Sequence, residues 1–106
     1  MAIYGRDNKQ SFETGSLAID VPGTAQQLTA HYVPQGQYLT VHADPDNDGD
    51  IYIGESKAKA EAHHFTLTPD ASLQLAVDNV SDVWADAEAQ KTCVVEWIVE
   101  IANEDV

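Results

Sequence analysis

Acidic residues at regular spacing are the clearest candidates for chemistry in this sequence. The segment from Asp44 to Glu55 reads Asp-Pro-Asp-Asn-Asp-Gly-Asp-Ile-Tyr-Ile-Gly-Glu, which matches the pattern of a calcium-binding loop. Carboxylates at Asp44, Asp46 and Asp48 could converge on a hard cation. Gly49 permits the sharp turn, and Glu55 could complete the coordination shell with both of its oxygens. A calcium site is therefore one interpretation of this segment.

The residues around this segment favour a different interpretation. An EF-hand needs a helix on each side of its loop, whereas residues 37–43 and 50–53 alternate between apolar and polar side chains, as strands do. A strand at this position would carry Glu55 away from Asp44 by about 3.3 Å per residue, so the last ligand would be lost. Asp, Asn and Gly are also the usual residues of a tight turn. We therefore favour a solvated turn between two strands and assign no metal ligand.

The other reactive side chains do not form a recognisable catalytic set. His63 and His64 are adjacent and would point to opposite faces of an extended segment, so we expect them, with His31 and His42, to be solvated or at interfaces. Cys93 falls on the apolar side of an alternating segment, which predicts a buried thiol. The sequence has no G-x-S-x-G elbow, no glycine-rich phosphate loop and no H-E-x-x-H motif. We expect no enzyme, no catalytic residue and no cofactor.

The net charge of the chain excludes some classes of binding partner. Eighteen Asp and Glu against five Lys and Arg give a net charge of −13 over 106 residues, which repels nucleic acid and anionic lipid. We also expect no membrane span and no signal peptide, because no long apolar run and no basic start followed by an apolar stretch occur. Such an acidic surface is stable where concentrated salt screens its repulsion. A halophilic source explains this composition, and an ordinary acidic protein is the alternative.

The elements that must position these residues are strands. Apolar residues alternate with period two from residue 16 onward, and no apolar stripe of useful length has helical spacing. Turn residues separate the alternating segments, as in an antiparallel β-sandwich, either a jelly roll or an immunoglobulin-like fold. The length and the 43% apolar content suit one domain. About seven strands are expected, at residues 17–21, 28–32, 39–43, 51–53, 73–77, 83–85 and 93–101.

Two segments break this alternation. Residues 1–15 are polar, carry two of the six glycines and show no alternation, so we expect a flexible N-terminal arm, unless a neighbouring molecule orders it, before a sandwich domain over residues 16–106. Residues 55–62 contain good helix formers, but they are too few for a helix that stands without packing. A loop or a single helical turn is expected there.

The second face of the strands carries large apolar side chains. If Cys93, Trp97 and the apolar residues between and after them face the core, Ile98 points outward, and the same alternation exposes Tyr38, Tyr52 and Trp84. Isolated exposed aromatic residues are ordinary, and loops could cover some of these. A cluster of them would form an oligomer or assembly interface, which is the interpretation that we favour.

Three stretches carry a resemblance to a known group of proteins. Residues 39–54 (LTVHADPDNDGDIYIG), 65–75 (FTLTPDASLQL) and 79–87 (NVSDVWADA) resemble small β-sandwich structural proteins of tailed viruses. The similarity extends over residues 36–101 and departs at Asp70, where the group usually has glycine. The resemblance implies that Asp44, Pro45, Asn47 and Gly49 form a structural turn. Together with the acidity, it suggests a tailed virus of a halophilic archaeon.

This resemblance implies a non-enzymatic protein of the virion, assembled in the host cytoplasm. It would multimerise on the particle as a capsid decoration, turret or spike-base component, with a head-to-tail or tail component as the alternative. We expect a homo-oligomer, trimer or larger, that contacts other virion proteins such as the major capsid protein and binds no nucleic acid or membrane. The alternative of another class is a calcium- or carbohydrate-binding sandwich, in which Asp44, Asp46 and Asp48 hold a cation and exposed aromatic rings stack on sugar.

Overall fold

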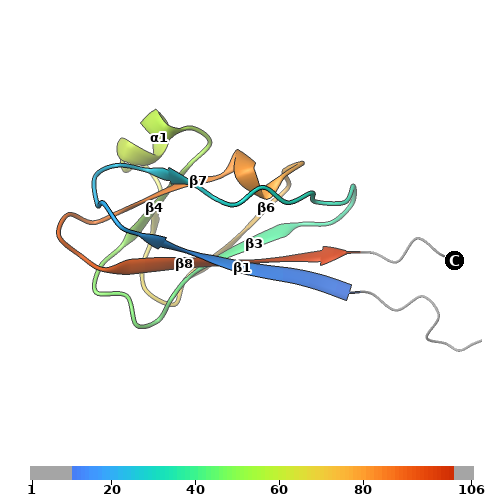
Figure 1. Cartoon of the computed structure of the whole chain (residues 1–106), viewed down its shortest axis with the longest axis horizontal. Helices are drawn as coiled ribbons and strands as arrows, with labels where there is room; N and C mark the ends of the chain where they lie inside the picture. Colours follow the sequence, from blue (N-terminus) through green and yellow to red (C-terminus); the bar gives the residue numbers. More distant parts are fainter. Residues whose placement is uncertain (1–10, 102–106) are drawn as a thin grey trace, which may run out of the picture.

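The computed structural model describes residues 11–101, which form two antiparallel four-stranded sheets packed on each other (Figure 1). Sheet A has the order β1 (Ser11–Ile19), β8 (Cys93–Ile101), β3 (Leu39–Ala43) and β6 (Ser72–Leu75). Sheet B has the order β2 (Gln26–Gln27), β7 (Trp84–Ala87), β4 (Ile51–Gly54) and β5 (Thr66–Leu67). The prediction of an all-β antiparallel sandwich is confirmed.

The pairing of the strands identifies the type of sandwich. Strand β1 pairs with β8, β2 with β7, β3 with β6, and β4 with β5, all antiparallel. These nested pairs are what results when one long hairpin is rolled up into two sheets, which is the jelly-roll arrangement. An immunoglobulin-like sandwich distributes seven to nine strands differently. Of the two predicted alternatives, the chain adopts the jelly roll.

The core lies between the two sheets and follows the predicted alternation. On β8, Cys93, Val95, Trp97 and Val99 are buried, so the predicted inward face of this strand is confirmed. The Trp97 indole covers Gly15 on the neighbouring strand, where a Cβ atom would lie only 2.5 Å from the ring. Glycine at this position therefore lets the largest core side chain lie flat against β1.

The first strand begins earlier than the sequence indicates. Residues 11–15 were expected to belong to the N-terminal arm, and this is wrong, because they form the first half of β1 and pair with residues 97–101 of β8. Backbone hydrogen bonds hold this half of the strand, so it needs no alternation of apolar side chains. Residues 1–10, the rest of the expected arm, lie outside the described residues, as do 102–106.

Another expected strand, over residues 28–32, is mostly irregular. Strand β2 covers only Gln26–Gln27, and Tyr32 makes an isolated bridge to Asn79. The backbone of this segment bonds to loops instead, for example from the Leu28 N–H to the Val83 carbonyl at 3.0 Å. Leu28 is buried but Tyr32 is exposed, so the alternation of residue types here does not reflect alternating burial.

One short helix covers the outer face of sheet B. Helix α1 (Lys57–Glu61) is the single helical turn expected in this segment, and the Ser56 side chain caps its N-terminus. A Cβ atom at Gly54 would lie 2.3 Å from the Ala60 nitrogen, so the helix packs directly on the backbone of β4. A 3-10 turn (Val80–Asp82) precedes β7. One outer face is thus covered, and the outer face of sheet A carries no helix among the described residues.

Candidate functional site

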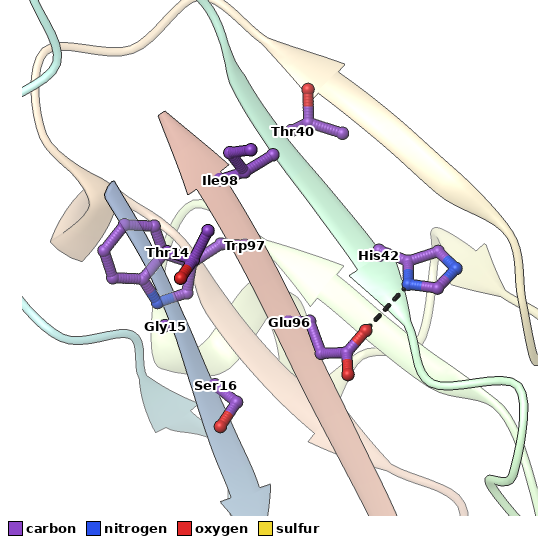
Figure 2. A pocket seen from close by; sticks show the side chains of 8 residues that line it. All are labelled: Thr14, Gly15, Ser16, Thr40, His42, Glu96, Trp97 and Ile98. Carbon is purple, nitrogen blue, oxygen red and sulfur yellow. Dashed lines mark hydrogen bonds and ion pairs between the residues drawn. The ribbon is translucent and has the colours of Figure 1, made fainter. Parts of the chain in front are cut away.

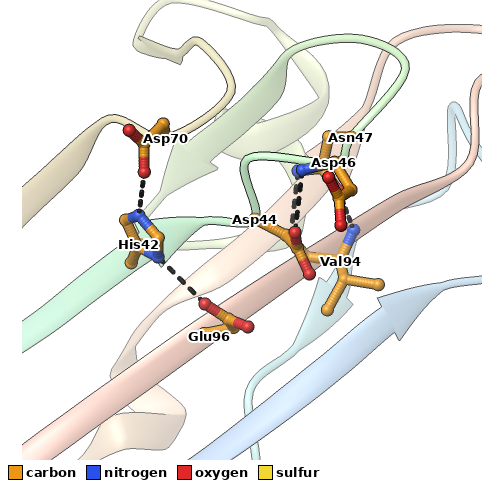
Figure 3. A network of polar contacts seen from close by, with 7 residues as sticks. All are labelled: His42, Asp44, Asp46, Asn47, Asp70, Val94 and Glu96. Atoms are coloured by element: carbon orange, nitrogen blue, oxygen red, sulfur yellow. Dashed lines mark hydrogen bonds and ion pairs between the residues drawn. The ribbon is translucent and has the colours of Figure 1, made fainter.

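The acidic turn joins β3 of sheet A to β4 of sheet B and is fixed by its own side chains. The Asn47 amide donates to the Val94 carbonyl at 3.0 Å and accepts from the Val94 N–H at 2.7 Å, so it ties the turn to β8 (Figure 3). Asp44 Oδ1 accepts the Asp46 N–H at 2.8 Å. These bonds are those of a structural turn, in which side-chain oxygens satisfy backbone donors.

Glu55 and Gly49, which also belong to the calcium-loop pattern, make contacts with other parts of the chain. Glu55 follows β4 and forms an ion pair with Lys59 at 3.3 Å. Gly49 is buried, and its carbonyl accepts a weak hydrogen bond from the Cys93 thiol. Within residues 11–101, no three His, Cys, Asp or Glu side chains are grouped so that they could hold a metal ion. The geometry of the turn gives no reason to assign a metal ligand.

A histidine on the outer face of sheet A lies between two carboxylates. His42 Nδ1 is 2.9 Å from Glu96 Oε1, and its Nε2 is 3.0 Å from Asp70 Oδ1 (Figure 3). The hydrogen bond to Glu96, followed by that to Asp70, raises the pKa of His42 above its ordinary value of 6.5. We call these three residues the open cluster, because Glu96 is 43% and Asp70 73% exposed.

The backbone at Asp70 has an unusual conformation. Asp70 has a φ of 74°, in the left-handed region that favours glycine. Aspartate is one of the few other residues that tolerates this region. Here it also brings a carboxylate to His42, which glycine could not supply.

A second histidine and carboxylate pair lies on the outer face of sheet B, beside α1. Asp86 is fully buried, and its Oδ1 accepts the N–H groups of Gly23 and Ala87, both at 2.8 Å. Its Oδ2 lies 2.8 Å from His63 Nε2. The His63 ring stacks on Tyr52 with centroids 3.8 Å apart and planes at 16°. We call Tyr52, His63 and Asp86 the covered cluster.

The covered cluster was not expected from the sequence. His63 and His64 were predicted to lie in an extended, solvated segment, but His63 follows the end of α1 with a φ of 60° and turns toward Asp86. His63 is 39% exposed, which agrees with the expected solvated histidine. The segment is not extended there, however, because the chain leaves the helix through a left-handed residue. An available signal was Asp86 itself, since a carboxylate between two alanines of a strand needs buried partners.

The outer face of sheet A is hollowed beside the open cluster. A hollow of about 540 Å³ lies over β1, β8 and β3, and Figure 2 shows the side chains that line it. They offer hydroxyl groups, an imidazole and a carboxylate. Since both nitrogens of His42 are bonded to carboxylates, this histidine is not free to act as a general base. The lining suits hydrogen bonding to an uncharged polar group or to a cationic group. It consists of Thr14, Gly15, Ser16, Thr40, His42, Glu96, Trp97 and Ile98.

Exposed apolar side chains gather at one end of the same face. Phe12 is 64%, Tyr38 55% and Ile98 38% exposed. Phe12 lies opposite Glu100 in the ladder, so it shares the outer face with Ile98, and Tyr38 and Ile98 line a small hollow of about 140 Å³. We call Phe12, Tyr38 and Ile98 the apolar patch.

The structure divides the apolar residues that were expected to form one interface. Tyr38 and Ile98 belong to the apolar patch, but Tyr52 and Trp84 lie on sheet B and are half-buried. The interpretation of all four as one surface is therefore wrong, because the strands that carry them belong to different sheets. Phe12 was missed, since it falls in the segment that was assigned to the arm.

Comparisons with known proteins add nothing to this description. No family model, no curated protein and no solved structure matches the chain. Separately, no helix among residues 11–101 is long and apolar enough to cross a membrane. The function must therefore be argued from the site and the fold.

Proposed function

We propose that the protein is a non-enzymatic structural component of a virus particle, which multimerises through the outer face of sheet A. Its place would be a capsid decoration, turret or spike base, with a tail or head-to-tail component as the alternative position. The observation that carries the proposal is the apolar patch, where three large side chains stay exposed on a face that no helix covers among residues 11–101. Exposed apolar surface that is gathered in this way commonly marks an interaction site.

The fold supports a role on a particle by analogy. Jelly rolls recur in viral capsid proteins and in lectins, so the topology is compatible with both classes. The resemblance of residues 36–101 to small structural proteins of tailed viruses favours the first class. An archaeal halophile as host accounts for the net charge of −13.

The energetics suit assembly in many copies. Complete burial of a Phe, Tyr or Ile side chain contributes about 2 kcal/mol, and the patch residues are already about half buried, so each adds roughly 1 kcal/mol on assembly. Three such contributions are weak for an isolated pair of molecules. On a particle, many equivalent contacts act together and produce a high total affinity.

Light scattering after size exclusion tests the proposal. In about 1 M salt, which screens the surface charge, we expect the wild-type protein to have the mass of a trimer or larger. The double variant Tyr38→Ser with Ile98→Ser should lose this assembly. Phe65→Ser is the matched control, because Phe65 is 46% exposed but lies outside the patch. A wild-type protein that stays monomeric over the accessible concentration range contradicts the proposal.

A carbohydrate-binding module is the second candidate. It is favoured by the hollow of about 540 Å³, whose hydroxyl and carboxylate groups could bind sugar hydroxyls beside the exposed Tyr38 ring. A monomer that binds glycans on an array, and loses binding in the Tyr38→Ser variant, would establish this function. Isothermal titration with calcium tests the alternative in which the acidic turn binds a cation. Heat above that of dilution would support this alternative.

A further inference from the structure

Strand β1 is a long edge strand without a neighbour on one side. It pairs with β8 in an unbroken register over nine residues, and sheet A places nothing beyond it among the described residues. The other three edge strands are shorter, with four residues in β6 and two each in β2 and β5. Free N–H and C=O groups along a long edge strand are a template for pairing with another strand.

The composition of β1 supplies little of what usually protects such an edge. Natural edge strands carry lysine, proline, inward-pointing charges or bulges that prevent pairing. The segment Ser-Phe-Glu-Thr-Gly-Ser-Leu-Ala-Ile contains no lysine and no proline, and one charged residue, Glu13, in a chain that carries 18 acidic residues. Glu13 lies opposite Val99, on the core side of the ladder, and is the single protecting charge of this strand. This edge is thus nearly free of the charge that would repel a second acidic molecule.

We infer that β1 pairs with β1 of a second copy of this chain, antiparallel and around a two-fold axis at Gly15, to form a continuous eight-stranded sheet. The inference rests on the proposed function, because it specifies how two copies meet during assembly. Centring the pair on Gly15, the middle residue of the strand, lets all nine residues of each strand pair. An interface of this kind presents the same surface from both molecules.

The side chains agree with this register. Thr14 lies opposite Ser16 of the partner subunit, so small hydroxyl residues meet on the outer face. Glu13 lies opposite Leu17 of the partner subunit, so no two carboxylates of β1 are placed directly against each other, which would be destabilising. The pairing also makes the outer faces of two copies of sheet A continuous. Phe12 lies opposite Ala18 of the partner subunit, so the two apolar patches lie at opposite ends of this shared face and stay free to contact further copies.

A disulfide experiment tests the register. The single variants Thr14→Cys and Ser16→Cys are mixed in equal amounts under mild oxidation, and intact masses are measured without reductant. We expect the mixed disulfide to form faster than either homodimer, because only the mixed pair lies directly opposite across the axis, within disulfide reach. The native Cys93 is buried, which raises the pKa of its thiol and keeps it out of the reaction.

The opposite edge of the same sheet supplies the control. Ser72→Cys lies on β6 and is exposed, so it reports random collision and pairing through the other edge. We expect Ser72→Cys to cross-link much more slowly than the mixed pair. Faster cross-linking at Ser72, or equal rates for all pairs, would overturn the inference.

Charge substitutions at the same two positions give an independent readout. In the double variant Thr14→Lys with Ser16→Lys, like charges face each other across the axis, and we expect an assembly of clearly lower mass than wild type at about 0.15 M salt. In Thr14→Lys with Ser16→Glu, opposite charges meet, and the wild-type mass should be retained. Both sites are exposed, so circular dichroism should show an unchanged fold.

The outcomes separate this inference from the proposed function. A wild-type protein that is monomeric contradicts both. An oligomer that ignores the lysine pair and forms no preferred disulfide between positions 14 and 16 overturns the pairing of β1 and leaves the proposed function standing. If the oligomer is lost only when the apolar patch is substituted, the pairing of β1 is likewise overturned and the proposed function stands.

Discussion

The covered cluster and the open cluster use the same pair of chemical groups in opposite surroundings. Each places an imidazole 2.8 to 3.0 Å from a carboxylate on the outer face of its sheet. The Asp86 carboxylate is inaccessible to solvent and accepts three hydrogen bonds, whereas Asp70 and Glu96 remain open to water. Burial of the carboxylate therefore decides the role of such a pair. The covered cluster connects the segments of Gly23 and His63 to β7. The open cluster should respond to the pH and the salt concentration of the solution.

Removing the buried carboxylate should have the largest effect. Asp86→Ala leaves the Gly23 and Ala87 N–H groups without their acceptor, so we expect the free energy of unfolding to fall by about 3 kcal/mol. Glu96→Ala, the matched change in the open cluster, should cost less than about 1 kcal/mol. Urea unfolding in molar salt measures both values. Equal losses would show that burial does not separate the two clusters.

Exchanging the histidines should have an intermediate effect. His63→Phe keeps a ring against Tyr52 but removes the hydrogen bond to Asp86, and we expect a loss of about 2 kcal/mol in the free energy of unfolding. His42→Phe, which loses only bonds to exposed carboxylates, should change it by less than about 1 kcal/mol. The same urea titration applies. If His42→Phe is the more damaging variant, the open cluster has a structural role that its exposure does not indicate.

The pH dependence of stability should come from the open cluster. Glu96 and Asp70 stabilise protonated His42, so its folded-state pKa lies above the unfolded value of 6.5. The stabilisation is therefore fully present below about pH 6.5 and is lost as the pH rises through the folded-state pKa. Unfolding free energies of wild type and His42→Gln between pH 5.5 and 8.5 should converge toward the alkaline end. A constant difference between them would contradict this assignment.

Salt should produce the smallest difference. Raising salt from about 0.1 M to about 1 M screens exposed charges, so the NMR titration midpoint of His42 should move toward its ordinary value. The cost of Asp86→Ala should change little, since buried pairs are screened much less. A strong salt dependence of the Asp86→Ala cost would show that solvent reaches the Asp86 carboxylate.

The fold was predictable where burial alternates along a strand. The core-facing residues as expected are Leu39, Val41 and Ala43 on β3, Ile51 and Ile53 on β4, and Trp97 on β8. Residues 11–15 were missed because hydrogen bonds to β8, and not an apolar face, hold them in place. Period-two patterns report burial, so a strand that is held mainly through its backbone leaves little trace in the sequence.

The site was less predictable than the fold. The acidic turn was correctly placed between strands, and the role of Asn47 in it follows from its bonds to Val94. The bond between His63 and Asp86 depends on the exact end of α1 and on a left-handed residue, and neither has a signal in the local residue pattern. Similarly, Phe12 enters the apolar patch only because β1 begins before it.

The pairing of β1 with β8 also determines how the chain can fold. Gly15 and Trp97 are neighbours in the ladder although most of the sequence lies between them. Sheet A therefore has a high contact order, and closing so long a loop costs entropy before any pairing repays it. On the ribosome, the side of β1 that pairs with β8 and the surface at Gly15 that Trp97 covers have no partner until β8 emerges. We expect folding over milliseconds to seconds, limited by the arrival and docking of this last strand.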